Sequence, residues 1–310
     1  MGGVLLILFR YLGQIGDTLF IMCSAWFLCD RESSKAAKCI KLVLDSFVIS
    51  IIGLGIASAF MCPTIKEIVR CVFPVTFQTN WFVGCYIIYF LIHPLLNRAV
   101  KDLMRTQFRA LTVIMLLAYS VVSTVHSSYY FTNLVAFIMM HYLVSYTKRY
   151  EFFKRDAKLD VIGIIICSWL LLTLIILMII AGSKVGALAD KNLLFCHFYN
   201  PLIIGIVMPA LFIAARKKWI SKIVNTISGL SLFVYLIHGN YFWQAYGKYS
   251  THHYLRMAGF EMVDSTLILF AITAAGSLII AFSYKSTVGR ATEKLATYIG
   301  NAIGFESKHS

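Results

Sequence analysis

The sequence is a succession of apolar segments separated by short basic connections. About nine segments approach the roughly 20 residues that a helix needs to cross a bilayer. They are Tyr11 to Cys29, Leu42 to Cys62, Trp81 to Leu96, Leu111 to Val125, Tyr130 to Tyr146, Val161 to Ala181, Tyr199 to Ala215, Ile227 to Tyr246 and Thr266 to Tyr284. Because lipid offers no partner for backbone polar groups, this pattern predicts an all-α, polytopic transmembrane helical bundle.

The composition agrees with a chain that lies almost wholly in the membrane. Hydrophobic residues make up 59% of the sequence and charged residues only 14%. No repeat and no Pro-rich or Ser-rich linker separates the apolar segments. We therefore expect one transmembrane domain over residues 1–310, with the lipid bilayer as its main partner.

The basic residues follow the first, third, fifth, seventh and ninth segments. The formal net charge of +14 would suit a nucleic-acid-binding protein, but this distribution is typical of membrane topology instead, so no nucleic-acid partner is expected. By the positive-inside rule these connections are cytoplasmic, and so is the C-terminus. The N-terminus then falls outside, so we expect one further helix upstream. The clusters are Arg31/Lys35/Lys38/Lys41, Arg98/Lys101/Arg105/Arg109, Lys148/Arg149/Lys154/Arg155/Lys158, Arg216/Lys217/Lys218/Lys222 and Lys285/Arg290/Lys294/Lys308.

The first segment carries an acid at membrane depth. Asp17 shares a helical face with Gly13 and Ser24, and Arg10 stacks above the same stripe. A charged side chain there costs a few kcal/mol unless it faces protein or water. Asp17 therefore either lines a functional cavity or pairs with Arg10 while the small residues permit close helix packing.

Two further segments place aromatic and imidazole groups on one face. In the third, Trp81, Cys85, Tyr89 and His93 follow one another at intervals of four, with Tyr86 adjacent, a pattern that can line a sugar or acyl cavity. The alternatives are an interfacial Trp81 and a kink at His93, which precedes Pro94. In the eighth, Tyr235 and His238 share a face before Gly239-Asn240 interrupts the apolar run. His238 can act as a base or an acid, or it can be structural.

No metal site is expected. The eight cysteines form no C-x-x-C pair and have no histidine cluster beside them, although Cys62 and Cys71 flank one loop and could form a disulfide. That loop, Pro63 to Asn80, has the pattern of a short interfacial helix. Asp45 follows Lys41 by four residues, which predicts a surface ion pair.

Three stretches together resemble the integral-membrane acyltransferase 3 family. They are GQIGDTLFIMCSAWFLCD, FPVTFQTNWFVGCYIIYFLIHPLLN and ISGLSLFVYLIHGN. Family members typically have ten helices with both termini cytoplasmic, so this chain resembles a member without the first helix, where the family's catalytic histidine usually lies. The resemblance leaves His238 and Asp17 as the candidate catalytic residues. Asn97, with Tyr86 and Tyr89, matches the family's third-helix motif and is expected to line the substrate path. The polar and aromatic faces described above add Arg10, Ser24, Trp81, His93 and Tyr235 as candidate substrate-binding residues.

The resemblance implies an enzyme of the inner (plasma) membrane. It would move an acyl group, commonly acetyl, from cytoplasmic acyl-CoA to a hydroxyl of a cell-envelope sugar, as in the O-acetylation of polysaccharides. The basic connections suit the phosphates of CoA. Two alternatives remain: a non-catalytic polysaccharide or lipid carrier or flippase, and an inactive truncated member of the family.

Overall fold

The computed structural model describes residues 2–77, 81–126, 131–152, 155–184, 195–217, 222, 226, 228–259 and 261–302. In these ranges the chain is helical and has no strand, which confirms the all-α prediction. Some residues of the expected spans and basic clusters lie outside the described ranges, namely Tyr130, Lys154, Lys218, Ile227 and Lys308.

Among the described residues, 5 helices are long and apolar enough to cross a membrane. They are Ala36–Ser58, Trp81–Ala99, Arg105–Val125, Ala157–Gly182 and Val263–Ser286, and they coincide with the expected second, third, fourth, sixth and ninth segments. The expected first, fifth and seventh segments coincide with helices α1 (Gly2–Leu28), α7 (Asn133–Tyr150) and α10 (Pro201–Lys217). The chain is therefore a multi-pass membrane protein by helix length and composition.

The eighth segment differs from the single span that we expected. Helix α12 (Ser231–His238) ends at the Gly239-Asn240 pair, and the π-helical turn η3 (Trp243–Gly247) then leads into α13 (Lys248–Met257). The side chain of Asn240 accepts the backbone N–H of Phe242 at 3.1 Å. A short polar side chain that binds nearby backbone in this way competes with the helical hydrogen bond, and this explains the break.

Contacts divide the chain into two compact units, which are described separately. Unit 1 comprises Gly3–Ser33 and Ile92–Trp219, and unit 2 comprises Ser34–Leu91 and Ile220–Ser310. The division falls within helix α4 (Trp81–Ala99), which contributes residues to both.

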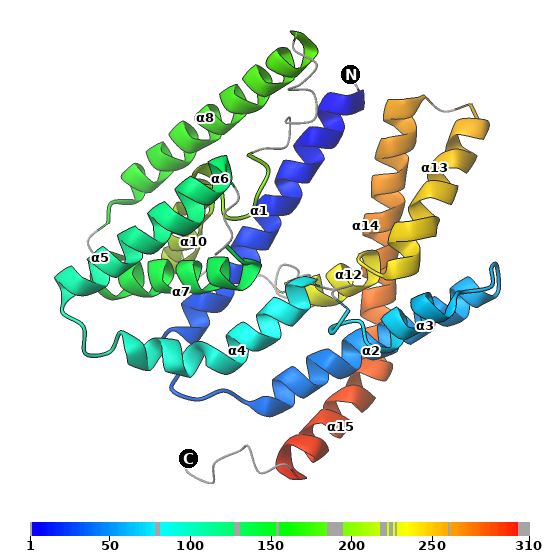
Figure 1. Cartoon of the computed structure of the whole chain (residues 1–310), viewed down its shortest axis with the longest axis horizontal. Helices are drawn as coiled ribbons and strands as arrows, with labels where there is room; N and C mark the ends of the chain where they lie inside the picture. The colour runs from blue at the N-terminus through cyan, green and yellow to red at the C-terminus, as the bar shows by residue number, and fades with distance from the viewer. Residues whose placement is uncertain are drawn as a thin grey trace. The chain divides into compact units, whose positions relative to one another are not determined.

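Unit 1 contains α1, α5 (Arg105–Leu116), η1 (Leu117–Val122), α6 (Ser123–Val125), α7, α8 (Ala157–Lys184) and α10. Helices α8 and α10 pack side by side (Figure 1). A Cβ atom added to Gly205 of α10 would lie 2.6 Å from Sγ of Cys167 on α8, so glycine permits this close approach. Ile165 and Trp169 of α8 are 61% and 68% exposed, as expected for side chains that contact lipid.

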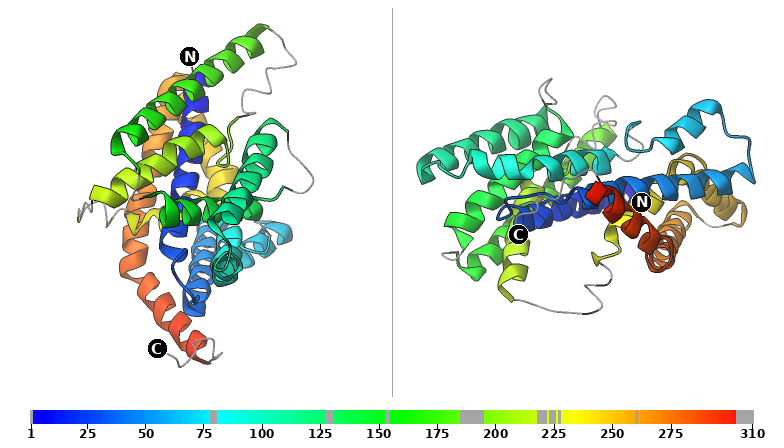
Figure 2. Two further views of the ribbon diagram at one scale, coloured as in Figure 1. Left: turned by 90° about the vertical axis from the view of Figure 1, so that its left-hand side faces the viewer. Right: turned by 90° about the horizontal axis from the view of Figure 1, so that it is seen from below.

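Unit 2 contains α2 (Ala36–Ser58), α3 (Ile65–Val72), α12, η3, α13, α14 (Met262–Ser286) and α15 (Val288–Ala302). The chain changes direction between α14 and α15 (Figure 2). Helix α15 packs against α2. Its buried face consists of small residues: Gly289, Thr292, Ala296 and Gly300.

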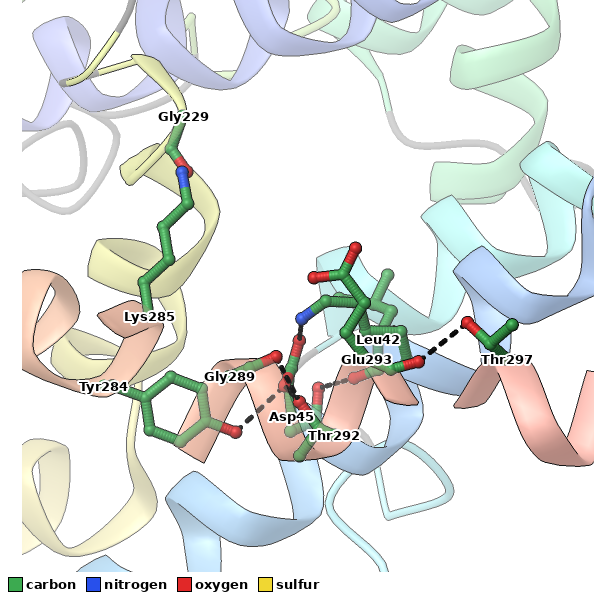
Figure 3. Close-up of polar contacts among 11 residues, drawn as sticks. Leu42, Asp45, Gly229, Tyr284, Lys285, Gly289, Thr292, Glu293 and Thr297 are labelled. Atoms are coloured by element: carbon green, nitrogen blue, oxygen red, sulfur yellow. Dashed lines mark hydrogen bonds and ion pairs between the residues drawn. The ribbon is translucent and has the colours of Figure 1, made fainter. Parts of the chain in front are cut away.

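A buried carboxylate joins three helices of unit 2. Asp45 of α2 accepts from Nζ of Lys41 at 2.8 Å, which confirms the expected ion pair, but the side chain lies in the interior rather than at the surface. Its Oδ1 atom also accepts from the hydroxyls of Tyr284 on α14 at 2.9 Å and Thr292 on α15 at 2.6 Å (Figure 3). These bonds compensate the carboxylate for lost hydration.

Substitution of Asp45 tests this arrangement. In Asp45→Ala the Lys41 ammonium and two buried hydroxyls lose their acceptor, so we expect the free energy of unfolding to fall by about 3–5 kcal/mol. Asp45→Asn keeps one acceptor oxygen and should lose less. Unfolding in detergent measures both, with Glu293→Ala on the exposed face of α15 as the control. Equal stability of Asp45→Ala and the control would contradict the prediction.

Candidate functional site

The break between α12 and η3 is fixed by one asparagine. Asn240 is buried, and besides the bond to Phe242 its Nδ2 donates to the carbonyl of Ile49 on α2 at 3.4 Å. Gly53 leaves the room for it, because an added Cβ there would lie 2.7 Å from Oδ1 of Asn240. The side chain of Asn240 thus holds the break against α2, where Gly53 leaves room for it.

His238 lies at the end of α12, immediately before this break. Its Nδ1 atom is 2.8 Å from the carbonyl oxygen of Val234. A carbonyl only accepts hydrogen bonds, so Nδ1 carries the hydrogen and, in the neutral ring, Nε2 is the atom with the lone pair. The side chain is half-buried, and its ring meets that of Tyr235 edge-on at 5.6 Å. The neutral ring therefore has a fixed tautomer, with Nε2 as its acceptor nitrogen.

The aromatic residues predicted on α4 extend from this histidine. The ring of Tyr235 lies 5.3 Å from that of Phe82, which meets Trp81 at 5.6 Å. Tyr86 packs against the apolar core of unit 2, and its ring lies 6.3 Å from that of Tyr89, which is fully buried. Unit 2 therefore brings Tyr235 to His238 and to the start of α4.

Helix α3 docks beside the same break through a carboxylate that the sequence did not single out. Glu67 accepts from the hydroxyls of Tyr246 at 2.6 Å and Tyr241 at 3.3 Å, and it forms a capping box with Thr64. These bonds, the one from Tyr246 above all, lower the pKa of Glu67 to about 2. Arg70 lies over the ring of Tyr241 at 5.7 Å. The helix expected in this loop is confirmed.

In unit 1, the side-chain amide of Asn97 joins three elements. Its Nδ2 donates to the carbonyls of Leu28 at 2.9 Å and Arg31 at 2.7 Å, which uses both amide hydrogens. Oδ1 of Asn97 therefore accepts from Nε2 of His141 at 2.8 Å. His93 is buried within electrostatic range of His141. Asn97 thus ties α4 and α7 to the end of α1, a contact that spacing along the chain does not reveal.

The remaining predicted residues lie on α1. Asp17 and Ser24 are half-buried, and Arg10 is exposed. The hypothesis of an Arg10–Asp17 pair is wrong, because none of the ion pairs in the described part of the chain joins them. Arg10 instead lies within electrostatic range of Cys196 and His197, which precede α10.

The segment from Phe195 to Asn200 is irregular backbone held inside unit 1. The hydroxyl of Thr18, next to Asp17, donates to the carbonyl of Phe198 at 2.5 Å, and that of Ser120 donates to the carbonyl of Tyr199 at 2.5 Å. Hydroxyls from α1 and η1 thus satisfy carbonyls that no helix serves. This contact accounts for the hydroxyl of Thr18 on the first segment.

The basic residues of unit 1 fall into two groups. Some form ion pairs with acids: Lys148 with Asp30, Arg105 with Glu151, and both Arg155 and Arg216 with Asp160. Others are exposed and form no ion pair with a described residue: Arg31, Arg98 and Arg109. The second group leaves positive charge for an anionic ligand.

Two further expectations concern cysteine and metal. Cys62 and Cys71 are free thiols, so the disulfide considered above is not formed. Within the described ranges, no group of three or more His, Cys, Asp or Glu side chains is arranged to hold a metal ion.

A polytopic helical chain with a tautomer-fixed histidine at a helix break is consistent with a membrane-embedded transferase. Comparison with known families identifies which one. Residues 2–282 match the acyltransferase domain of the acyltransferase 3 family, and the chain belongs to this family of membrane-bound acyltransferases. No curated protein and no solved structure matches the chain significantly.

Gly53 provides a matched pair of substitutions. In Gly53→Ala the new methyl group meets the side chain of Asn240, so we expect a loss of about 1–3 kcal/mol in stability and reduced acyl transfer. Gly55→Ala, two residues on, meets nothing within 4 Å and should be neutral or slightly stabilising. Unfolding and transfer assays compare the two variants. Identical behaviour would contradict the role of Gly53.

The lowered pKa of Glu67 predicts a defined response to acid. Because the folded-state pKa lies below the ordinary value of 4.5, its contribution to stability is complete above pH 4.5 and is lost as the pH falls toward about 2. Glu67→Gln should remove this part of the acid destabilisation, and Tyr246→Phe should reduce it. Melting temperatures between pH 7 and pH 2.5 measure it, with exposed Glu261→Gln as the control. An unchanged acid profile in Glu67→Gln would refute the assignment.

Proposed function

We propose that the protein transfers an acyl group, commonly acetyl, from cytoplasmic acyl-CoA to a hydroxyl of a cell-envelope sugar, with His238 as the general base. Family membership supports acyl transfer. The geometry of His238 carries the choice of base, since the Val234 carbonyl holds the hydrogen on Nδ1 and leaves Nε2 to accept the proton of the acceptor hydroxyl.

The reaction follows from this assignment. Nε2 of His238 takes the hydroxyl proton as the sugar oxygen forms a bond to the thioester carbon. The carbon–sulfur bond then breaks, and the thiolate of the donor recovers the proton. Tyr235, Phe82 and Trp81 offer flat ring faces, and Tyr235 adds a hydroxyl group, a combination that suits a sugar.

The exposed arginines of unit 1 indicate the acyl donor. Arg31, Arg98 and Arg109 are exposed without an acid partner among the described residues, and guanidinium groups bind phosphate with strong, charge-assisted hydrogen bonds. Arg31 follows α1, Arg98 lies in the last turn of α4 and Arg109 lies near the start of α5. The connections beside them are those that the positive-inside rule places in the cytoplasm, where acyl-CoA is found. Asp17 remains a proposed supporting residue, because its half-buried carboxyl adjoins the Thr18 contact described above.

The test of the function is transfer of labelled acetyl from acetyl-CoA to a glycan in membranes that contain the protein. His238→Ala removes the base, so we expect the rate to fall by about 10²–10⁴-fold. His253→Ala, an exposed histidine on α13, is the matched control and should retain full activity. Full activity of His238→Ala would exclude His238 as the base. Movement of the glycan without consumption of acetyl-CoA, unchanged in His238→Ala, would favour a carrier.

A further inference from the structure

A half-buried lysine lies close to the proposed base. Lys248 is the first residue of α13, directly after η3, and it lies within electrostatic range of His238. Burial lowers the pKa of its ammonium group. A π-helical turn beside a histidine also fits a functional site, since such turns are frequent there.

The charge of Lys248 is not balanced by an acid. None of the ion pairs in the described ranges includes Lys248. Its Nζ atom donates instead to Oε1 of Gln244 at 2.6 Å, a neutral partner that leaves the charge uncompensated. A partly desolvated cation without a counter-ion has a strong electrostatic affinity for any negative charge that forms nearby.

A short hydrogen-bonded chain holds this cation near the base. Nε2 of Gln244 donates to the carbonyl of His238 at 2.5 Å, and the other end of the same amide accepts from Lys248. The break after α12 frees that carbonyl, because the N–H of Phe242 binds Asn240 instead. One glutamine thus connects the backbone of the base to the ammonium group.

We propose that Lys248 is a further catalytic residue, whose ammonium group stabilises the oxyanion formed during acyl transfer. The inference rests on the proposed function. When the acceptor oxygen bonds to the thioester carbon, its proton passes to Nε2 of His238 and the carbonyl electron pair moves onto oxygen. Lys248 stabilises that negative charge until the carbon–sulfur bond breaks and the carbonyl re-forms. Positioned cations and donors of this kind commonly supply a large share of the rate enhancement.

A purely structural role makes different predictions. In that case Gln244 and Lys248 would only cap the negative end of α12, since a cation near a helix C-terminus is stabilising. Gln244→Ala and Lys248→Met would then lower stability together and affect activity only through it. A catalytic role requires a loss of kcat in Lys248→Met that stability does not account for.

The experiment measures kcat, the KM for the acceptor and the melting temperature of the full-length protein in membranes or detergent, with acetyl-CoA and a glycan acceptor. In Lys248→Met we expect kcat to fall by about 10²–10³-fold, with KM and melting temperature close to the parent. Lys248→Arg keeps the charge and should recover part of the activity. Gln244→Ala keeps the lysine and should lose less than Lys248→Met. Lys294→Met, at an exposed position of α15, is the control for loss of one positive charge.

The outcomes separate this inference from the proposed function. An unchanged kcat in Lys248→Met, or a fall matched by a lower melting temperature and by Gln244→Ala, would overturn the role of Lys248. If His238→Ala abolishes transfer while Lys248→Met does not, the proposed function stands and only this inference fails. If the parent protein transfers no acetyl group, the proposed function fails, and the role of Lys248, which rests on it, fails with it.

Discussion

The exchange of hydrogen-bond partners at Gly239-Asn240 is the constraint on which the candidate site depends. In apolar surroundings a broken helix leaves backbone groups without partners, and each is costly. Here the side chain of Asn240 accepts the N–H of Phe242, and Gln244 donates to the carbonyl of His238. Side chains of the same segment therefore bind the backbone groups that the break leaves without helical partners. Gly53 makes room for the asparagine. As a result, His238 ends a helix instead of lying within one.

Elsewhere in the two units, polar side chains at depth connect elements to one another. Asp45 joins α2, α14 and α15, Asn97 joins α4 and α7 to α1, and Thr18 holds the segment before α10. These groups have several partners each, as expected for buried polar groups that must offset desolvation. His238 and Lys248 differ, since Nε2 of the histidine keeps its lone pair in the fixed tautomer and the lysine has only a neutral partner. That difference distinguishes the candidate site from the structural contacts.

Individual residues show how far spacing along the chain predicts such a site. Tyr235 and His238 are three apart on one helix, so their proximity could be predicted, and the ring contact confirms it. The Lys41–Asp45 pair follows from the same periodicity, but its burial depends on Tyr284 and Thr292, more than 200 residues away. Helical spacing also permitted an Arg10–Asp17 pair, which is absent from the described residues; Arg10 lies within electrostatic range of Cys196 and His197. Glu67 and Lys248 were missed because they lie outside the apolar runs that drew attention to their neighbours.

The sequence by itself determined that the chain is all-α and polytopic, because apolar length and the lack of backbone partners in lipid leave helices as the solution. Its three motif stretches also indicated the acyltransferase 3 family, which the match over residues 2–282 shows. Only the tertiary structure decided where Asn97 bonds, how Asn240 fits against Gly53 and which cations lack an acid. Those properties depend on atoms brought together from distant parts of the chain, and hydrogen bonds act over distances of about 3 Å that helical periodicity does not specify.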